Sequence, residues 1–191
     1  MPRVSEVGPE SLPDDAAAIF QRYVTEYGPF GNQAKIFAHR PPAVRHIMGL
    51  LLDLADEQVL PKRYLEIGLV VVSKLNECEY CVAHHAPRLT SQGFHPEAAA
   101  RILDDEVPGF DEVDMLVRDY AVQVTNNFQY MRDAIFVELK KHFTEPQIVE
   151  LTLRIALCGF FNRFNDALQI SMEDGVEEEM EALGVGVEAA E

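Results

Sequence analysis

Apolar residues recur every three or four positions along most of the chain, which is the spacing of one face of an α-helix. This period persists from residue 14 to about residue 171. The sequence lacks the alternation of apolar and polar residues that marks half-buried strands, and it lacks hairpin turns of the Asn-Gly type. The pattern therefore predicts an all-α fold.

Proline, glycine and capping residues indicate where the helices begin and end. Pro87 falls inside the fourth expected helix, where its missing N–H is expected to kink or shorten the helix. Thr144 and Gln147 form a capping-box pattern before the longest helix. The expected helices are residues 14–27, 41–54, 61–75, 76–92, 96–103, 110–124, 132–142 and 144–171.

The length of 191 residues fits one domain better than two. Residues 1–13 are rich in proline, glycine and serine and are predicted to form an N-terminal arm. Residues 14–172 are predicted to form a single helical domain. Residues 173–191 contain eight acidic residues and no basic residue, and are predicted to form a solvated acidic tail.

The net charge of -16 disfavours binding to nucleic acid or to an anionic membrane, because phosphate recognition needs clustered Lys and Arg. The longest apolar runs, residues 67–72 and 155–161, are far shorter than the roughly 20 residues that span a bilayer. The first residues lack the apolar centre of a signal peptide. We therefore expect a cytoplasmic protein, in which thiols remain reduced unless they take part in redox chemistry.

Cys78 and Cys81 are three positions apart, so in the first turn of a helix both sulfurs lie on one side. The positive end of the helix dipole stabilises a thiolate there, which favours Cys78 as the more acidic thiol. A second cysteine converts a sulfenic acid into a disulfide before it oxidises further. The pair therefore predicts a redox-active site, whereas Cys158, alone in an apolar run, is expected to be inert core.

Two further residue types complete a candidate relay around the thiols. His85 follows Cys81 by four positions and can take the thiol proton, while the adjacent His84 projects about 100° away around the helix. Glu66 is the one acid in a strongly apolar segment, and a buried carboxylate needs a partner or a proton. A thiol–histidine–carboxylate relay supplies the partner, and burial is expected to raise the pKa of Glu66 towards neutrality.

Two other interpretations of these residues remain open at this point. Cys78, Cys81 and His85 with Glu66 supply four possible zinc ligands, although structural zinc sites usually combine two separated ligand pairs. No second pair is present, because the other histidines are dispersed at positions 39, 46, 95 and 142. The cysteines can also be ordinary core residues.

The segments that begin at Glu66 and Glu150 have similar residue patterns. Asn162 and Asn165 of the second segment take the places of Cys78 and Cys81 in the first. We interpret this similarity as a degenerate repeat of a two-helix unit in which only one copy keeps the thiols.

The spacing of Glu66, Cys78, Cys81 and His85 resembles the signature of the alkyl hydroperoxidase D-like proteins, members of the carboxymuconolactone decarboxylase superfamily. Residues 150–168 also resemble the last core helix of that superfamily. The resemblance implies an all-α helical bundle that assembles into homo-oligomers, trimers or hexamers. It implies an antioxidant thiol peroxidase without a cofactor or metal, which reduces a small hydroperoxide and is itself reduced by a dithiol carrier.

In that family pattern Cys81 attacks the peroxide, Cys78 resolves it to a disulfide, and Glu66 and His85 relay the proton. One departure is Tyr80, which stands where some members have a histidine, and a phenol is a poor base at neutral pH. The alternatives are a decarboxylase-like enzyme that acts on a lactone acid, with pocket-lining arginines such as Arg88, Arg154 and Arg163, or a metal-binding or assembly module.

Overall fold

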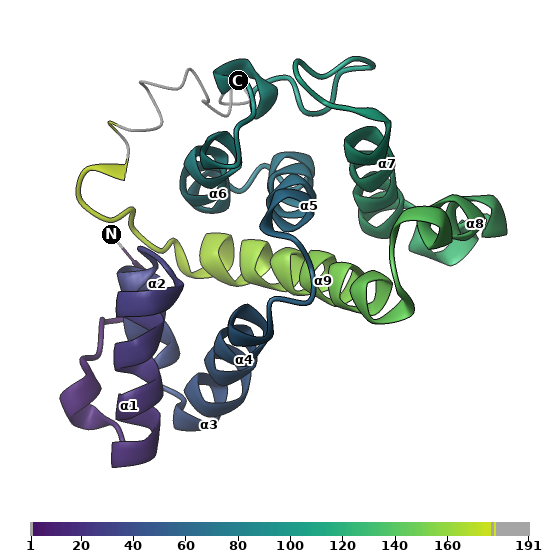
Figure 1. The fold of residues 1–191 in the computed structure, drawn as a ribbon. Helices are drawn as coiled ribbons and strands as arrows, with labels where there is room; N and C mark the ends of the chain where they lie inside the picture. Colours follow the sequence, from purple (N-terminus) through teal and green to yellow (C-terminus); the bar gives the residue numbers. More distant parts are fainter. Residues whose placement is uncertain (1, 177, 179–191) are drawn as a thin grey trace. The chain divides into compact units, whose positions relative to one another are not determined.

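A computed structural model describes residues 2–176 and 178, and all regular elements of this part of the chain are helical (Figure 1). The all-α prediction is confirmed. The α-helices are α1 (Asp14–Arg22), α2 (Gly31–Phe37), α3 (Pro41–Ala43), α4 (Gly49–Glu57), α5 (Lys62–Leu75), α6 (Glu79–Ser91), α7 (Glu112–Asn126), α8 (Asp133–His142) and α9 (Glu145–Leu168). Short π-helical segments extend α1 and join α3 to α4, at Tyr23–Tyr27 and Val44–Met48.

By their contacts the described residues form two compact units, residues 2–58 with 165–175, and residues 59–164 with 176 and 178. The predicted single domain over residues 14–172 stays a prediction. Most of the predicted acidic tail, residue 177 and residues 179–191, lies outside the described residues. Each unit is considered by itself below.

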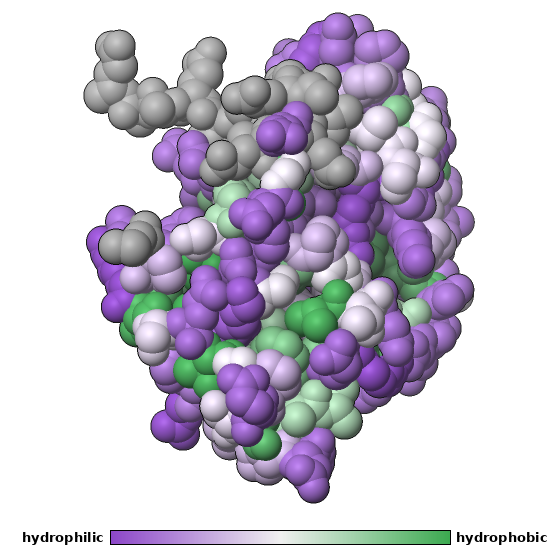
Figure 2. Space-filling view, turned by 90° about the vertical axis from the view of Figure 1, so that its left-hand side faces the viewer, coloured by the Kyte–Doolittle hydropathy of each residue, from purple (hydrophilic) through white to green (hydrophobic). Residues whose placement is uncertain are grey.

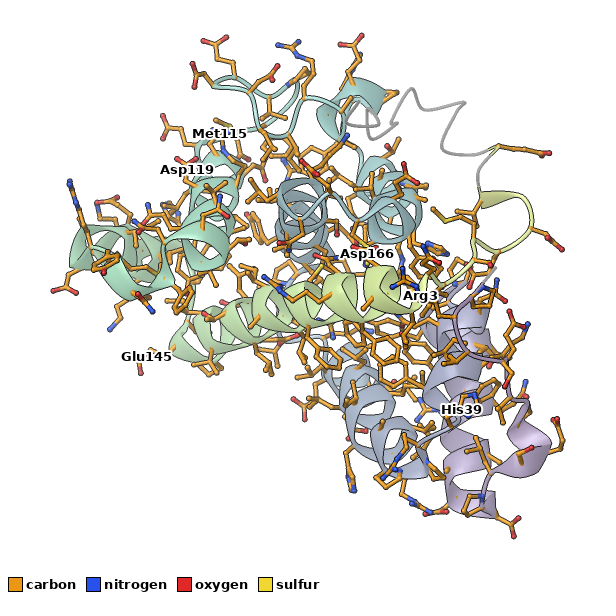
Figure 3. The ribbon with its side chains drawn as sticks, turned by 180° about the vertical axis from the view of Figure 1, so that it is seen from behind. Arg3, His39, Met115, Asp119, Glu145 and Asp166 are labelled. Carbon is orange, nitrogen blue, oxygen red and sulfur yellow. The ribbon has the colours of Figure 1, made fainter. Side chains whose placement is uncertain are left out.

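In the first unit, the N-terminal arm packs closely against other segments. The backbone N–H of Arg3 donates to the carbonyl of Leu168 at 2.8 Å, and its guanidinium donates to the carbonyl of Ala167 at 2.9 Å. Figure 3 shows Arg3 beside the C-terminal end of α9. Further along the arm, Leu12 is buried. These contacts attach the described part of the arm, residues 2–13, to the rest of the unit.

The short helix α2 was not predicted from the sequence. Its Gln33 is buried, accepts a hydrogen bond from Tyr23 Oη at 3.1 Å and donates one to Asn165 Oδ1 at 3.0 Å. Asn32 donates to the carbonyls of Ser171 and Met172. Contacts with residues more than 130 positions away therefore stabilise this seven-residue helix, and a local apolar period cannot reveal them.

The second unit is built around α5, which packs against α6 and α7 (Figure 1). Residues 66–73 of α5 are all buried, as its nearly uniform apolar character predicts. Gly68 lets α9 approach closely, because a Cβ at this position would lie 3.3 Å from Ile155 Cγ1. The core thus places Glu66, on the same helix, between α6 and α9.

Caps and ion pairs fix the ends of the helices around α5. Asp111 and Asp114 form a reciprocal capping box at the start of α7, and Arg63 of α5 pairs with the fully buried Asp114. At the start of α9 the N–H of Thr144 donates to Gln147 Oε1 at 2.9 Å, and the N–H of Gln147 donates back to Thr144 Oγ1 at 3.5 Å. This arrangement confirms the capping box predicted at Thr144. The adjacent Glu145 marks the first turn of α9 in Figure 3.

Several predicted boundaries were wrong. The helix expected over residues 96–103 is only a short 3-10 turn, Pro96–Ala98, followed by further turns. The cysteine-bearing helix begins at Glu79, three residues after the predicted start, and it continues four residues beyond Pro87. The longest helix ends at Leu168, short of residue 171.

The predicted two-helix repeat was also wrong. The first segment bends at residues 76–78 between α5 and α6, whereas the second lies entirely in the uninterrupted helix α9. The two segments therefore share a pattern of residues but not a backbone structure.

Within the described residues, no helix is both long and apolar enough to cross a membrane. Figure 2 shows one face of the molecule, on which hydrophilic residues predominate and hydrophobic residues form separate patches.

Candidate thiol site

The two clustered cysteines lie at the start of α6, at complementary positions. Cys78 is the N-cap residue, with extended backbone angles, and Cys81 is the third residue of the helix. Side chains at the N-cap and at this third position approach one another in capping boxes, so the two thiols share the positive end of the helix. Cys78 is fully buried and Cys81 is 3% exposed. The predicted placement of both cysteines at a helix N-terminus is what the structure shows.

Only three residues separate α5 from α6, and their backbone turns tightly. Glu77 has a φ of 55°, in the left-handed region that non-glycine residues seldom adopt. The N–H of Cys78 donates to the carbonyl of Ser73 at 3.0 Å, and that of Glu77 donates to Lys74 at 3.2 Å. The end of α5 thereby sets the position of Cys78.

Glu66 and His85 form a buried hydrogen-bonded pair that joins α5 to α6. His85 Nδ1 lies 2.9 Å from Glu66 Oε2. Arg88, one turn further along α6, places its guanidinium 3.8 Å from the other carboxylate oxygen, Glu66 Oε1. The side chains of Glu66 and His85 are 6% and 9% exposed, while that of Arg88 is 30% exposed. The partner expected for the buried carboxylate is therefore His85, with Arg88 in addition.

Burial and the charges of this cluster determine the protonation states of Glu66 and His85. Burial would raise the pKa of Glu66, but the interaction with His85 and the positive charges of Arg88 and Arg154 together hold that pKa below its ordinary value. Burial lowers the pKa of His85, more than Glu66 raises it. Glu66 is thus ionised and His85 neutral near pH 7. The expectation that the pKa of Glu66 is raised was therefore wrong.

An ionised carboxylate only accepts hydrogen bonds, so Nδ1 of the neutral His85 must be the donor to Glu66. Its Nε2 then has a lone pair, and His85 is arranged as a base. A Glu–His pair of this kind can accept a proton from a nearby acid and stabilise the imidazolium that forms.

His84 takes a different role from His85. Its Nδ1 lies 2.6 Å from the carbonyl oxygen of Tyr80, one turn earlier in α6, and the two rings lie 4.3 Å apart. Tyr80 is buried. These contacts support the preference for His85 over His84 and the interpretation of Tyr80 as a core aromatic residue.

Cys158 lies apart from this chemistry. It is buried in α9, and burial raises the pKa of its thiol to about 12. Its sulfur lies 3.4 Å from Ser73 Oγ. A thiol this weakly acidic stays protonated at neutral pH, as expected for inert core.

The zinc interpretation receives no support from the arrangement. Among the described residues, no group of three or more His, Cys, Asp or Glu side chains is placed to hold a metal ion. Glu66, Cys78, Cys81 and His85 all lie in this part of the chain.

Sequence reasoning did not identify Arg88 as a partner of Glu66. The available signal was its position three residues after His85, which puts both side chains on one face of α6. Of the other arginines considered, Arg154 is buried and acts on the charge of Glu66. Arg163 instead donates to the carbonyl of Gly159 in its own helix at 2.7 Å.

Replacing Arg88 with glutamine is expected to raise the pKa of His85, because the positive charge of Arg88 lowers it. NMR titration of the His85 ring protons measures this shift directly. Arg88→Lys keeps the charge and is expected to stay closer to the wild type. Arg101→Gln, which removes an exposed arginine paired with Asp104, is the matched control and should leave His85 unchanged. A pKa of His85 that stays constant or falls in Arg88→Gln would contradict this assignment.

Comparison with known proteins agrees with the family resemblance. The model of the carboxymuconolactone decarboxylase family matches residues 41–112, the segment that holds Glu66, Cys78, Cys81 and His85. This segment is therefore similar to members of that family. No protein with a curated description matches the chain.

Solved structures with the same fold cover nearly the whole chain. An uncharacterised peroxidase-related protein from Ralstonia eutropha JMP134, with an alkylhydroperoxidase AhpD core, is 22% identical over 92% of this chain and 94% of its own, with a TM-score of 0.75. A peroxidase-related protein from Silicibacter sp. TM1040 is 21% identical over 85% of this chain and 86% of its own, with a TM-score of 0.73.

A third structure of similar fold is a cysteine-to-alanine variant of the debrominase Bmp8 in complex with 2,3,4-tribromopyrrole. It is 17% identical over 87% of this chain and 89% of its own, with a TM-score of 0.71. At these identities the comparisons show the fold, which is the alkylhydroperoxidase D-like fold.

Proposed function

We propose that this protein is a thiol-dependent hydroperoxide reductase. The observation that carries the proposal is the placement of Cys78 and Cys81 at the N-cap and third position of α6, beside a buried Glu66–His85 pair whose second nitrogen is a base. A paired thiol supplies two electrons, and the histidine supplies a place for the proton that the attacking thiol must lose.

The chemistry proceeds in two steps under this proposal. Cys81 loses its proton to His85 and attacks the terminal oxygen of the hydroperoxide; an S–O bond forms, the O–O bond breaks, and the leaving alkoxide takes up the proton as an alcohol. Cys78 then attacks the sulfenic sulfur, so that an S–S bond forms and water leaves. The two thiols are oxidised and the hydroperoxide is reduced.

A dithiol carrier closes the cycle by reducing the disulfide through thiol–disulfide exchange. Because both sulfurs are buried in the reduced protein, a bulky carrier needs a local opening at the start of α6. The proposal also includes a cytoplasmic location and a homo-oligomer, trimeric or hexameric, which follow from the composition and from the family resemblance.

Steady-state turnover tests the proposal. We expect the protein to consume hydrogen peroxide or an organic hydroperoxide with dithiothreitol as the electron donor. A Cys78→Ser, Cys81→Ser double variant should not turn over. A lactone acid is the comparison substrate. If the double variant still turns over the lactone acid, and the wild type consumes no peroxide, the protein is instead a decarboxylase-like enzyme.

A further inference from the structure

A network of polar side chains joins α9 to the turn that carries Cys78. Asn76 Nδ2 donates to Asn162 Oδ1 at 2.8 Å, and Asn162 is fully buried. Asn162 Nδ2 points to Cys158 Sγ at 3.8 Å, which in turn lies 3.4 Å from Ser73 Oγ. Ser73 is the residue whose carbonyl accepts the N–H of Cys78. The side chain of Asn162 thus contacts the turn directly at Asn76 and is linked to Ser73 through Cys158.

The two thiols differ in how their positions are held. Cys81 lies within α6, where the helical hydrogen bonds fix its backbone. Cys78 lies one residue before the helix, directly after the left-handed Glu77. The backbone at Glu77 is unfavourable for a residue with a side chain, so surrounding contacts must maintain it. Among the contacts beside this residue is the hydrogen bond from Asn76 to Asn162, which comes from another helix.

Disulfide formation is sensitive to this arrangement. A disulfide requires a narrow range of Cα separations and a dihedral angle near 90°. A small rotation of the turn moves Cys78 relative to Cys81, which lowers the effective concentration of one thiol near the other. The sequence comparison of the two segments had singled out Asn162 as the counterpart of Cys78, and in the structure Asn162 accepts a hydrogen bond from Asn76, two residues before Cys78.

We propose that Asn162 is a positioning residue, which holds the Asn76–Cys78 turn in the geometry that closes the Cys78–Cys81 disulfide. The inference rests on the proposed function only in taking these two thiols as the redox pair. It assigns Asn162 no contact with the substrate.

Equilibration of the protein with mixtures of reduced and oxidised glutathione tests this role. The balance is two protein thiols plus one oxidised glutathione, giving one protein disulfide and two reduced glutathiones. We expect Asn162→Ala to lower the equilibrium constant for the Cys78–Cys81 disulfide about tenfold, which corresponds to about 30 mV in reduction potential. Asn76→Ala, at a partly exposed position, should have a similar effect.

The double variant Asn76→Ala, Asn162→Ala distinguishes one shared interaction from two separate ones. Both single changes remove the same hydrogen bond, so the double variant should be no worse than Asn162→Ala alone. Thr152→Val is the matched control, because it removes another side-chain hydrogen bond of α9, the 2.6 Å contact between Tyr120 and Thr152. It should lower stability in urea without moving the glutathione equilibrium.

Three results would overturn the proposal: an unchanged equilibrium in both asparagine variants, additive effects in the double variant, or an equal shift in Thr152→Val. If Asn162→Ala fails to fold, Asn76→Ala carries the test. A wild-type protein that forms the disulfide with glutathione but consumes no peroxide would refute the proposed function and leave the role of Asn162 standing.

Discussion

Replacing Cys81 with serine is expected to lower hydroperoxide turnover by on the order of 10³-fold or more, as the loss of a catalytic nucleophile does in other enzymes. Replacing Cys78 with serine is expected to limit the protein to one peroxide per chain when no thiol reductant is added, because the sulfenic acid formed on Cys81 then has no thiol to resolve it. Peroxide consumption per chain, with trapping of the sulfenic acid by dimedone, measures both outcomes.

The matched control for these variants is Cys158→Ser. Its thiol is buried with a pKa raised to about 12, and a serine hydroxyl can still contact Ser73 and Asn162, so this change should leave the turnover close to that of the wild type. The opposite assignment, with Cys78 as the attacking thiol, predicts that dimedone labels Cys78 in Cys81→Ser. Unchanged turnover in Cys81→Ser would refute a thiol mechanism altogether.

Replacing Glu66 with glutamine is expected to lower kcat/KM by about 10²-fold, the lower end of what a general acid–base partner contributes. The amide oxygen can still accept the proton of His85 Nδ1, so the variant keeps the tautomer and removes only the charge. Glu66 raises the pKa of His85, and without it burial lowers that pKa further. His85 then becomes a weaker base, and it stays neutral to a lower pH.

The pH dependence of kcat/KM measures this change. We expect a lower plateau in Glu66→Gln, with the acid limb that reports protonation of His85 displaced to lower pH. Glu79→Gln is the matched control, because it removes an exposed charge from the first turn of α6 without touching His85. An acid limb displaced to higher pH, or a plateau equal to that of the wild type, would contradict the assigned role of Glu66.

The sequence was most informative where local signals act alone. The helices α1, α5, α7, α8 and α9 lie close to their predicted places, because apolar period, proline and capping residues determine them locally. The pairing of Glu66 with His85 was also predicted, since a lone acid in an apolar helix requires a nearby donor.

The features that the sequence did not predict depend on contacts between residues that are distant in sequence. The hydrogen bonds of Gln33 and Asn32 stabilise α2, and neither partner is nearby in sequence. Asn76 and Asn162 are 86 positions apart, so their contact was not predictable from spacing. The pKa of Glu66 is lowered because the interaction with His85 and the charges of Arg88 and Arg154 together outweigh the effect of burial. The sequence indicated only the burial.

The most direct test of the central claim is a titration of the fully reduced protein with one equivalent of hydroperoxide in the absence of reductant. After denaturation, alkylation and digestion, mass spectrometry identifies the state of each cysteine. The account predicts one intramolecular Cys78–Cys81 disulfide for each peroxide consumed, with Cys158 still a thiol. If Cys78 and Cys81 both remain thiols while peroxide persists, or if either is oxidised to a sulfinic acid without a disulfide, the account is contradicted.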